Sequence, residues 1–221
     1  MGTKFAPTYA TLVLGFLEEK LFTECKTLFG EDFGRYIETN WKRYLDDCFI
    51  FWTKSLQDLQ LFHNMLNRLH QNIKFTMESN ENELPFLDIL IIKDGTKITT
   101  DLYYKKTDSH QYLIFNSCHP SHTKRNIPFN MARRICTIVI DEDRRDARLS
   151  ELKIFLRRQK YPIQLIETAI QKAKEIPTTD LRTPKQREET TRKIPFVLTH
   201  NPRNHNMFKT AKQFFPILQQ S

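Results

Sequence analysis

Two adjacent carboxylates, Asp46 and Asp47, stand in the stretch RYLDDCFIF, residues 43–51. Residues 41–45 and 48–52 on either side are rich in aromatic and aliphatic side chains, which predicts two short strands joined by the aspartates. Adjacent carboxylates repel one another until a cation lies between them. A hard dication such as Mg²⁺ binds one or two carboxylates and completes its shell with water and substrate phosphate. Two such ions support phosphoryl transfer by activating the attacking oxygen and stabilising the leaving one.

The alternative is that Asp46-Asp47 is an ordinary hairpin turn. Two-residue turns prefer Asn-Gly, Asp-Gly or Gly-X, because their central residues adopt positive φ. The chain has Asp94-Gly95 between two other predicted strands, where a turn alone is needed. Asp-Asp is a poor turn by comparison, and departures from local rules concentrate at functional or strained sites. Metal chemistry is therefore a hypothesis that stands beside the ordinary turn.

A second group of possible metal ligands is Cys118, His119 and His122, with Cys136 or His110 as a fourth. Structural zinc sites take four Cys or His ligands, usually in closely spaced pairs, and that pairing is missing here. The four cysteines are far apart and fit reduced thiols better than a disulfide framework. We expect no zinc, and we interpret this segment as a turn that leads into a helical region.

Helices and a second hairpin are predicted around the aspartates. Pro7 suits the first turn of a helix, which Gly30 and Gly34 would end. Ser55 and Asp58 resemble a capping box at the start of another helix. Residues 74–78 are predicted to form a strand, and 86–92 and 97–105 the second hairpin. The apolar stripes of the two helices are Tyr9, Leu12, Val13, Phe16, Leu17 and Leu21, and Leu59, Phe62, Met65, Leu66 and Leu69.

The chain becomes helical after about residue 120. Pro128 and Pro162 are predicted to open two helices, and a third lies between them. Residues 177–193 are polar and contain prolines, which indicates a linker. A short strand at 194–198 and a helix at 207–218 are predicted to follow. The apolar faces of the three helices are Met131, Ile135 and Ile138; Leu149, Leu152, Phe155 and Leu156; and Ile163, Ile166, Ala169, Ile170 and Ala173.

Charge is unevenly distributed along the 221 residues, of which 39% are hydrophobic. Residues 1–120 have a net charge of −3, residues 121–193 of +8 and residues 194–221 of +3. A localised basic excess is the footprint expected for a nucleic-acid partner, and the alternative is a solvated helical surface. No apolar run approaches the ~20 residues of a membrane span, so no membrane partner is expected.

Several segments together resemble the reverse transcriptases of Penelope-like retroelements. Tyr44-Leu45-Asp46-Asp47 resembles their YxDD box, in a predicted strand–turn–strand setting that suits it. GTKFAPTYA at residues 2–10 resembles the preceding polymerase motif, a glycine loop that runs through a proline into a helix. LPFLDILI, DLYYKKTDSHQYL and SCHPSHTKRNIP are similar to the segments after the palm motifs, and IPFVLTHNP at 194–202 to the stretch beyond the thumb.

The resemblance implies an RNA-directed DNA polymerase, which extends a primer 3′-OH with dNTPs on an RNA template. The implied fold is α+β: a partial right-hand polymerase palm, an antiparallel sheet with helices, followed by a helical-bundle thumb. Residues 1–118 would be the palm, 119–176 the thumb and 177–221 a linker and C-terminal extension. The implied cofactor is Mg²⁺, with two ions in the complete enzyme, and the implied partner is a primer–template or RNA–DNA duplex. The family's way of life implies an intracellular location, nuclear or cytoplasmic, with the nucleus favoured.

The resemblance also assigns roles to particular residues. Asp46 and Asp47 match the catalytic, metal-binding carboxylates, and Asp46 is the stronger of the two assignments. The nucleotide- and template-binding residues would be Gly2, Lys4, Phe5, Pro7 and Tyr44. Primer-grip candidates are Phe86, Leu87 and Asp88. The thumb would track the nucleic-acid backbone through Lys124, Arg125, Arg133 and Arg134.

Departures from the family leave a second function open. The family has another metal-binding aspartate upstream of the glycine loop, and no residue before Met1 supplies it. The fingers are missing as well, so we expect this chain to be an internal piece of a longer polymerase that is inactive alone. The alternatives are a non-catalytic nucleic-acid-binding remnant of a retroelement, or a structural α+β domain with an accidental resemblance.

Overall fold

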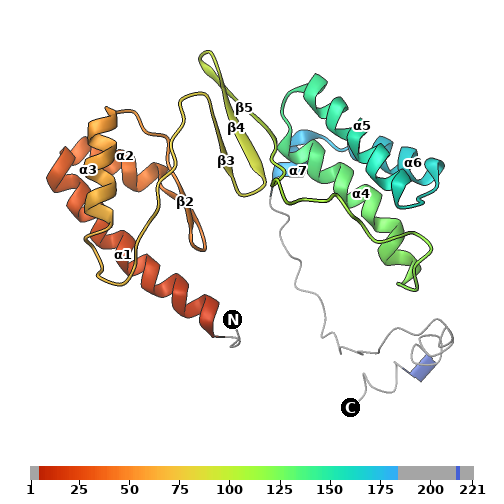
Figure 1. Cartoon of the computed structure of the whole chain (residues 1–221), viewed down its shortest axis with the longest axis horizontal. Helices are drawn as coiled ribbons and strands as arrows, with labels where there is room; N and C mark the ends of the chain where they lie inside the picture. The colour runs from red at the N-terminus through yellow and green to blue at the C-terminus, as the bar shows by residue number, and fades with distance from the viewer. Residues whose placement is uncertain (1–4, 184–212, 215–221) are drawn as a thin grey trace. The chain divides into compact units, whose positions relative to one another are not determined.

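The chain folds into helices and small antiparallel sheets, which confirms the predicted mixture of helix and strand. The computed structural model describes residues 5–183 and 213–214. Gly2, Lys4 and the strand predicted at 194–198 lie outside the described residues, as does the helix predicted at 207–218 except for its helical residues 213–214. The chain divides into two compact units, residues 1–87 and 88–221, which are described separately (Figure 1). The division predicted from the resemblance concerns polymerase subdomains and stays a prediction.

Three helices build most of the first unit: α1 (Ala6–Phe29), α2 (Glu31–Asn40) and α3 (Leu56–Leu66). Pro7 lies in the first turn of α1, as predicted. Ser55 caps α3 by accepting a hydrogen bond from the backbone N–H of Asp58 at 3.1 Å, so the predicted helix start is confirmed.

The prediction that Gly34 ends the first helix is wrong, because this residue lies inside α2. The chain turns at Gly30 instead, whose φ of +88° favours glycine. Gly34 has a different purpose: a Cβ there would lie 2.7 Å from the Cα of Lys26. Glycine therefore lets α2 approach the backbone of α1.

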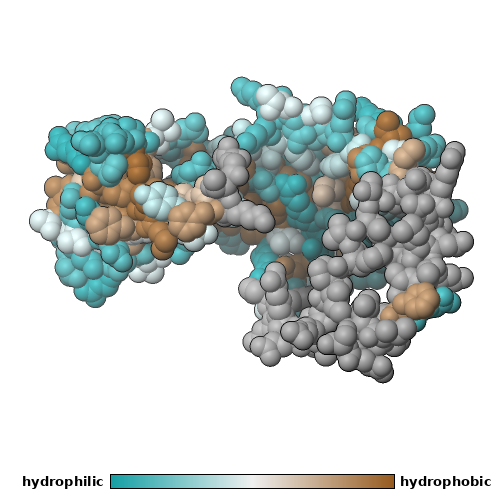
Figure 2. All heavy atoms as spheres, turned by 90° about the horizontal axis from the view of Figure 1, so that it is seen from below, coloured by the Kyte–Doolittle hydropathy of each residue, from teal (hydrophilic) through white to brown (hydrophobic). Residues whose placement is uncertain are grey.

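The first core is formed by the second half of α1 together with α2 and α3. The apolar stripe predicted for α1 is correct from Leu17 onward and wrong before it: Tyr9, Leu12 and Phe16 are more than half exposed. The first turns of α1 are thus left uncovered by the other described elements of this unit, and Figure 2 shows hydrophobic side chains in a band across the unit. The buried members of the core are Leu21, Cys25, Ile37, Leu59, Phe62, Met65 and Leu66.

Residues 74–78 do not form the predicted strand. Their backbone is held by side chains instead, since Asn67 accepts a hydrogen bond from the N–H of Phe75 at 2.7 Å and donates one to its carbonyl at 3.1 Å. The ring of His63 also lies 2.8 Å from that carbonyl. The next strand is β3 (Glu83–Phe86), and Phe86 packs on Phe49 with ring centroids 5.4 Å apart.

The second unit contains the predicted second hairpin, formed by β4 (Ile89–Asp94) and β5 (Lys97–Leu102). Asp94 pairs with Lys97, so the turn residues are Gly95 and Thr96, one position later than predicted. Gly95 has a φ of +59°, which explains why glycine stands at this position.

A helical bundle follows: α4 (Ser121–Ile138), α5 (Glu142–Arg158), α6 (Ile163–Lys174) and the short α7 (Thr178–Arg182). Pro162 precedes α6 directly, as predicted. The prediction that Pro128 opens a helix is wrong, because it lies inside α4 with its ring buried. Burial of the ring in the core offsets the hydrogen bond that proline removes from the helix.

Core contacts and one ion pair hold the second unit together. Leu149, Leu152 and Leu156 of α5 are buried, as the predicted stripe requires. Asp101 of β5 is only 3% exposed, and Arg148 of α5 donates to both of its carboxylate oxygens, at 2.9 and 3.0 Å. Burial would raise the pKa of Asp101, but hydrogen bonds from Arg148 and from the N–H of Leu102 hold it below its ordinary value.

Candidate functional site

Asp46 and Asp47 lie at the tip of the two-stranded hairpin β1 (Lys42–Tyr44) and β2 (Asp47–Phe49). Tyr44 pairs with Asp47, so the turn residues are Leu45 and Asp46 and the predicted position of the turn is off by one. Leu45 has a φ of +56°, a conformation that residues with a Cβ adopt rarely. The first carboxylate therefore projects from a strained turn and the second from the first residue of a strand.

Both carboxylates are exposed to solvent. Within the described residues, neither side chain has a hydrogen-bond or ion-pair partner from the protein. Tyr44 beside them is 59% exposed and Leu45 is 53% exposed. The two aspartates are thus accessible to a hydrated cation, and no described cationic side chain neutralises them.

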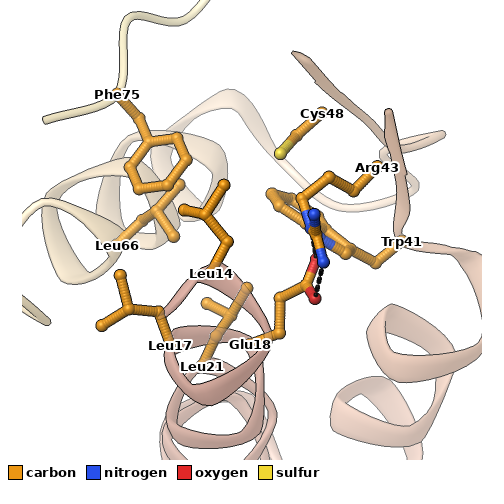
Figure 3. Close-up of a pocket in the computed structure, with 9 residues that line it drawn as sticks. All are labelled: Leu14, Leu17, Glu18, Leu21, Trp41, Arg43, Cys48, Leu66 and Phe75. Atoms are coloured by element: carbon orange, nitrogen blue, oxygen red, sulfur yellow. Dashed lines mark hydrogen bonds and ion pairs between the residues drawn. The ribbon is translucent and has the colours of Figure 1, made fainter. Parts of the chain in front are cut away.

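A clamp between α1 and the hairpin holds this turn in place (Figure 3). Arg43 of β1 donates from Nε to Oε1 of Glu18 at 2.6 Å and from Nη2 to Oε2 at 3.0 Å. Its third donor, Nη1, lies 3.3 Å from the carbonyl oxygen of Leu45, the residue with positive φ. Trp41 Nε1 also donates to Glu18 at 2.9 Å. One guanidinium therefore joins the strained turn to a helix of the first core.

The clamp lies at the edge of a small apolar pocket, which favours the ion pair. The side chains of Arg43 and Glu18 are only 16% and 20% exposed, and the hydrogen bonds to Glu18 raise the pKa of Arg43. Burial, with Glu18 nearby, raises the pKa of the Cys48 thiol to about 11. The pocket is also lined by Leu14, Leu17, Leu21, Trp41, Leu66 and Phe75 (Figure 3).

Sequence reasoning missed Glu18 and Arg43. A signal was present, because Trp41, Arg43 and Leu45 alternate along one face of a strand and Glu18 lies among the apolar residues of α1. A carboxylate and a guanidinium on two inward faces are expected to pair when they are buried. The sequence alone did not show that those faces meet.

The other residues assigned to nucleotide and template binding are not joined to the aspartates in the structure. Phe5 is 65% exposed and lies 6.0 Å from Tyr9, measured between ring centroids. Pro7 is exposed in the first turn of α1. No hydrogen bond, ion pair or ring contact among the described residues links Phe5 or Pro7 to Tyr44, Asp46 or Asp47.

The predicted primer-grip residues fall at a turn. Leu87 has a φ of +56°, and Phe86 packs within the first unit. Asp88 begins the second unit, where Arg134 of α4 lies 2.5 Å from its carboxylate and the N–H of Tyr103 donates to its carbonyl. The carboxylate of Asp88 is thus engaged within the protein.

The described residues contain no group of three or more His, Cys, Asp or Glu side chains that could hold a metal ion. His119 contacts the hydroxyl of Ser117 at 2.9 Å, and Cys118 is exposed. Cys136 is buried in the second core, and His110 stacks on Phe155. Asp46 and Asp47 are therefore a pair of possible ligands without a third described partner.

The four cations predicted to contact a nucleic-acid backbone all lie on α4, and they differ in their surroundings. Lys124 donates to the carbonyl of Ser117 at 2.6 Å, and Arg134 pairs with Asp88. Arg125 and Arg133 are exposed and have no side-chain partner within the described residues. Two of the four thus hold the fold together, and two are free to bind an anion.

Comparison with known proteins gives one match. Residues 111–171, less than a third of the chain, match the family model of the animal helix-turn-helix domain. This stretch contains α4, α5 and most of α6. No curated protein and no solved structure matches the chain. No helix in the described part of the chain combines the length and apolar character needed to cross a membrane.

Proposed function

We propose that this chain is the palm and thumb part of an RNA-directed DNA polymerase, and that Asp46 and Asp47 are its metal-binding carboxylates. The observation that carries the proposal is the hairpin tip, where two adjacent carboxylates are exposed while Arg43 and Glu18 fix the turn behind them. The resemblance to Penelope-like reverse transcriptases supplies the reaction, and the nuclear or cytoplasmic location predicted from it is part of the proposal.

The donor set fits Mg²⁺. This ion prefers carboxylate oxygens, keeps several waters and is commonly held by one or two carboxylates together with substrate phosphates. Asp46 and Asp47 would hold it, and the bound ion would supply charge stabilisation for phosphoryl transfer. The clamp contributes by limiting the motion of the turn, because preorganised ligands bind more tightly than mobile ones.

The second unit would bind the nucleic acid. The helix-turn-helix match covers its helices, and helix-turn-helix domains use one helix in the major groove while others contact the backbone. Arg125 and Arg133 are free on α4 for such contacts. Both the resemblance to a polymerase and the helix-turn-helix match thus favour nucleic acid as the partner.

A second candidate is nucleic-acid binding without catalysis. It is favoured because the described residues gather only two carboxylates at the hairpin and no third metal ligand. In this case the helical unit would retain its partner, and the hairpin would contribute little to binding.

Primer extension separates the two candidates. The chain is incubated with Mg²⁺, dNTPs and an RNA template annealed to a labelled DNA primer, beside the variant Asp46→Asn. Product that the variant fails to form supports the polymerase. Binding of the primer–template that survives Asp46→Asn, weakens steeply with salt and yields no product supports the non-catalytic candidate.

A further inference from the structure

Most cations on α5 and α6 are neutralised by carboxylates of the same unit. Their ion pairs are Arg144 and Arg148 with Asp101, Arg145 with Glu142, Lys153 with Glu167, and Lys174 with Asp146. Arg157, Arg158 and Lys160 are different, since all three are exposed and have no ion pair within the described residues. Three unneutralised cations therefore occupy four consecutive positions where α5 ends.

The segment before α4 lies against this end of α5. The N–H of Phe115 donates to the carbonyl of Gln159 at 3.0 Å, and the Phe115 ring lies 5.2 Å from that of Tyr161. Lys124 Nζ lies 5.7 Å from the centre of the Phe115 ring. Figure 1 also shows the first turn of α4 and the last turn of α5 on the same side of the bundle. Lys124 is thus brought towards the end of α5, and Arg125 follows it in the same turn of α4.

A histidine from the segment before α4 also lies at this end of α5. His110 stacks on Phe155 with ring centroids 4.3 Å apart, and the Arg158 guanidinium lies 6.0 Å from the same ring. The Phe155 ring thus helps to position the Arg158 guanidinium without neutralising it.

Carboxylates are absent from the two stretches of sequence that meet here. Residues 109–140 and residues 152–166 contain no Asp or Glu, while each stretch contains four Lys or Arg. Three unpaired cations thus lie together where α5 ends, while, among the described residues, ion pairs engage five of the other six cations of α5 and α6, and Lys172 stands alone. On an ordinary solvated surface, positive and negative side chains are interspersed, so unpaired cations would not gather at one end of a helix.

We propose that this basic end, formed by Arg125, Arg157, Arg158 and Lys160, binds the phosphate backbone of a nucleic-acid duplex. Arginine presents a planar fork that suits phosphate oxygens, and a row of unpaired cations suits the regular spacing of phosphates along a backbone. The helix-turn-helix match includes all four residues. The inference deepens the nucleic-acid part of the proposed function and names a surface other than Lys124 and Arg134, which are engaged within the protein.

The test compares two variants of equal charge. The first carries Arg157→Gln, Arg158→Gln and Lys160→Gln. The control carries Lys93→Gln, Lys97→Gln and Lys172→Gln, which removes three cations that are also exposed and have no ion pair within the described residues. Fluorescence anisotropy of a labelled RNA–DNA hybrid measures the dissociation constant between about 50 and 200 mM salt, because phosphate contacts make binding depend on salt in this range.

We expect the first variant to bind at least about tenfold more weakly at low salt, with a log–log salt slope smaller in magnitude by roughly 2 to 3, since each phosphate contact contributes about 0.9. The control should change the slope by less than about 1. Equal losses in both variants would mean that net charge alone drives binding, and unchanged binding in the first variant would mean that another surface is used. Either result overturns the inference.

Binding by the wild-type chain separates a failure of this inference from a failure of the proposed function. If it binds neither the hybrid nor a DNA duplex, the nucleic-acid part of the proposed function fails along with the inference. If it binds them and the first variant binds equally well, only the basic end is refuted. Phosphatidylserine vesicles are the remaining probe: binding to vesicles but not to the hybrid would assign this surface to a membrane and overturn the proposal.

Discussion

At the scale of single residues, Asp46 differs from Asp88 in its partners and not in its turn: both aspartates follow a leucine with a φ of +56°, but Asp88 is paired with Arg134 and Asp46 has no side-chain partner among the described residues. Asp94 precedes a glycine that accommodates its turn, whereas Asp46 follows Leu45 at a φ of +56°. The exposure of both carboxylates, their adjacent charges and the lack of a described protein partner favour a pair of ligands for a dication.

Replacing both aspartates with Asn tests this assignment. We expect the affinity for Mn²⁺, used as a paramagnetic substitute for Mg²⁺, to fall at least about tenfold, because two charged oxygen ligands are lost. The free energy of unfolding should change by less than about 0.5 kcal/mol, since both side chains are exposed. Electron paramagnetic resonance of free Mn²⁺ gives the affinity, and Asp94→Asn is the control. Unaltered Mn²⁺ binding in the double variant would contradict the assignment.

At the scale of elements, the hairpin depends on its clamp to α1. The two short strands, of three residues each, form a small sheet that would be marginal alone. Arg43 stabilises it by joining Glu18 and the carbonyl of Leu45 at once. The geometry of the carboxylates is therefore set by a residue that contacts neither of them.

Substituting Arg43 tests the clamp. Arg43→Met leaves Glu18 partly buried without its charged partner, and we expect a loss of about 2 kcal/mol in stability. Arg43→Lys keeps the charge but loses the two-pronged bond, so it should recover only part of this. Urea unfolding gives the free energies, and hydrogen exchange of the turn amides reports local motion. A double-mutant cycle with Glu18→Gln that shows no coupling energy would refute the clamp.

The ion pair between β5 and α5 gives a prediction about pH. The pKa of Asp101 is lowered in the folded state, so its ionised form stabilises the fold above the unfolded pKa of about 3.9, and this contribution is lost as pH falls through the folded pKa. Asp101→Asn should therefore cost most stability at neutral pH, on the order of 2 kcal/mol, and progressively less below about pH 4. Urea unfolding from pH 7 to pH 3 measures the difference, and a constant difference would contradict it.

At the scale of the whole molecule, two separate cores stabilise the chain. Phe62 is buried in the first core and Leu156 in the second. Compact units with their own cores are expected to open independently. The hairpin with the aspartates and the basic end of the helices thus belong to units with separate stabilities.

Paired core variants check this independence. Phe62→Ala should destabilise the first unit by roughly 3 to 5 kcal/mol, and Leu156→Ala the second by roughly 2 to 5 kcal/mol, because each leaves a cavity. Hydrogen exchange followed by mass spectrometry assigns the loss of protection to residues 5–87 or 88–183. Protection lost throughout both units from either variant would show that the chain unfolds as one.

Much of the secondary structure follows from patterns that act locally. The cap at Ser55, the stripe of α5 and the turn at Gly95 depend on nearby residues, and the sequence predicts them well. Pro128 and Gly34 were misread because their helices continue through them when tertiary packing compensates. Residues 74–78 have strand-like composition, but Asn67 satisfies the backbone of Phe75. Local sequence patterns give no information about such hydrogen-bond partners.

The candidate site was likewise predictable from the sequence only in part. The sequence points to Asp46 and Asp47 because two charges between apolar runs are locally unusual. Glu18 is 25 residues from Arg43, and the end of α5 meets a segment more than 30 residues earlier, so neither contact leaves a local signal. The basic end is defined by which cations have a carboxylate partner and which have none, and the sequence alone does not show those partners.

The central claim is that Asp46 and Asp47 bind the metal ions of a polymerase that acts on a primer–template. Iron-mediated cleavage tests it most directly: Fe²⁺ replaces Mg²⁺ in the presence of an RNA–DNA primer–template and dNTP, ascorbate generates hydroxyl radicals at the bound ion, and mass spectrometry locates the cut backbone. We predict cleavage close to residues 44–48 that requires the primer–template and disappears in the Asp46→Asn, Asp47→Asn variant. Cleavage elsewhere, or cleavage at the hairpin that persists in this variant, would contradict the account.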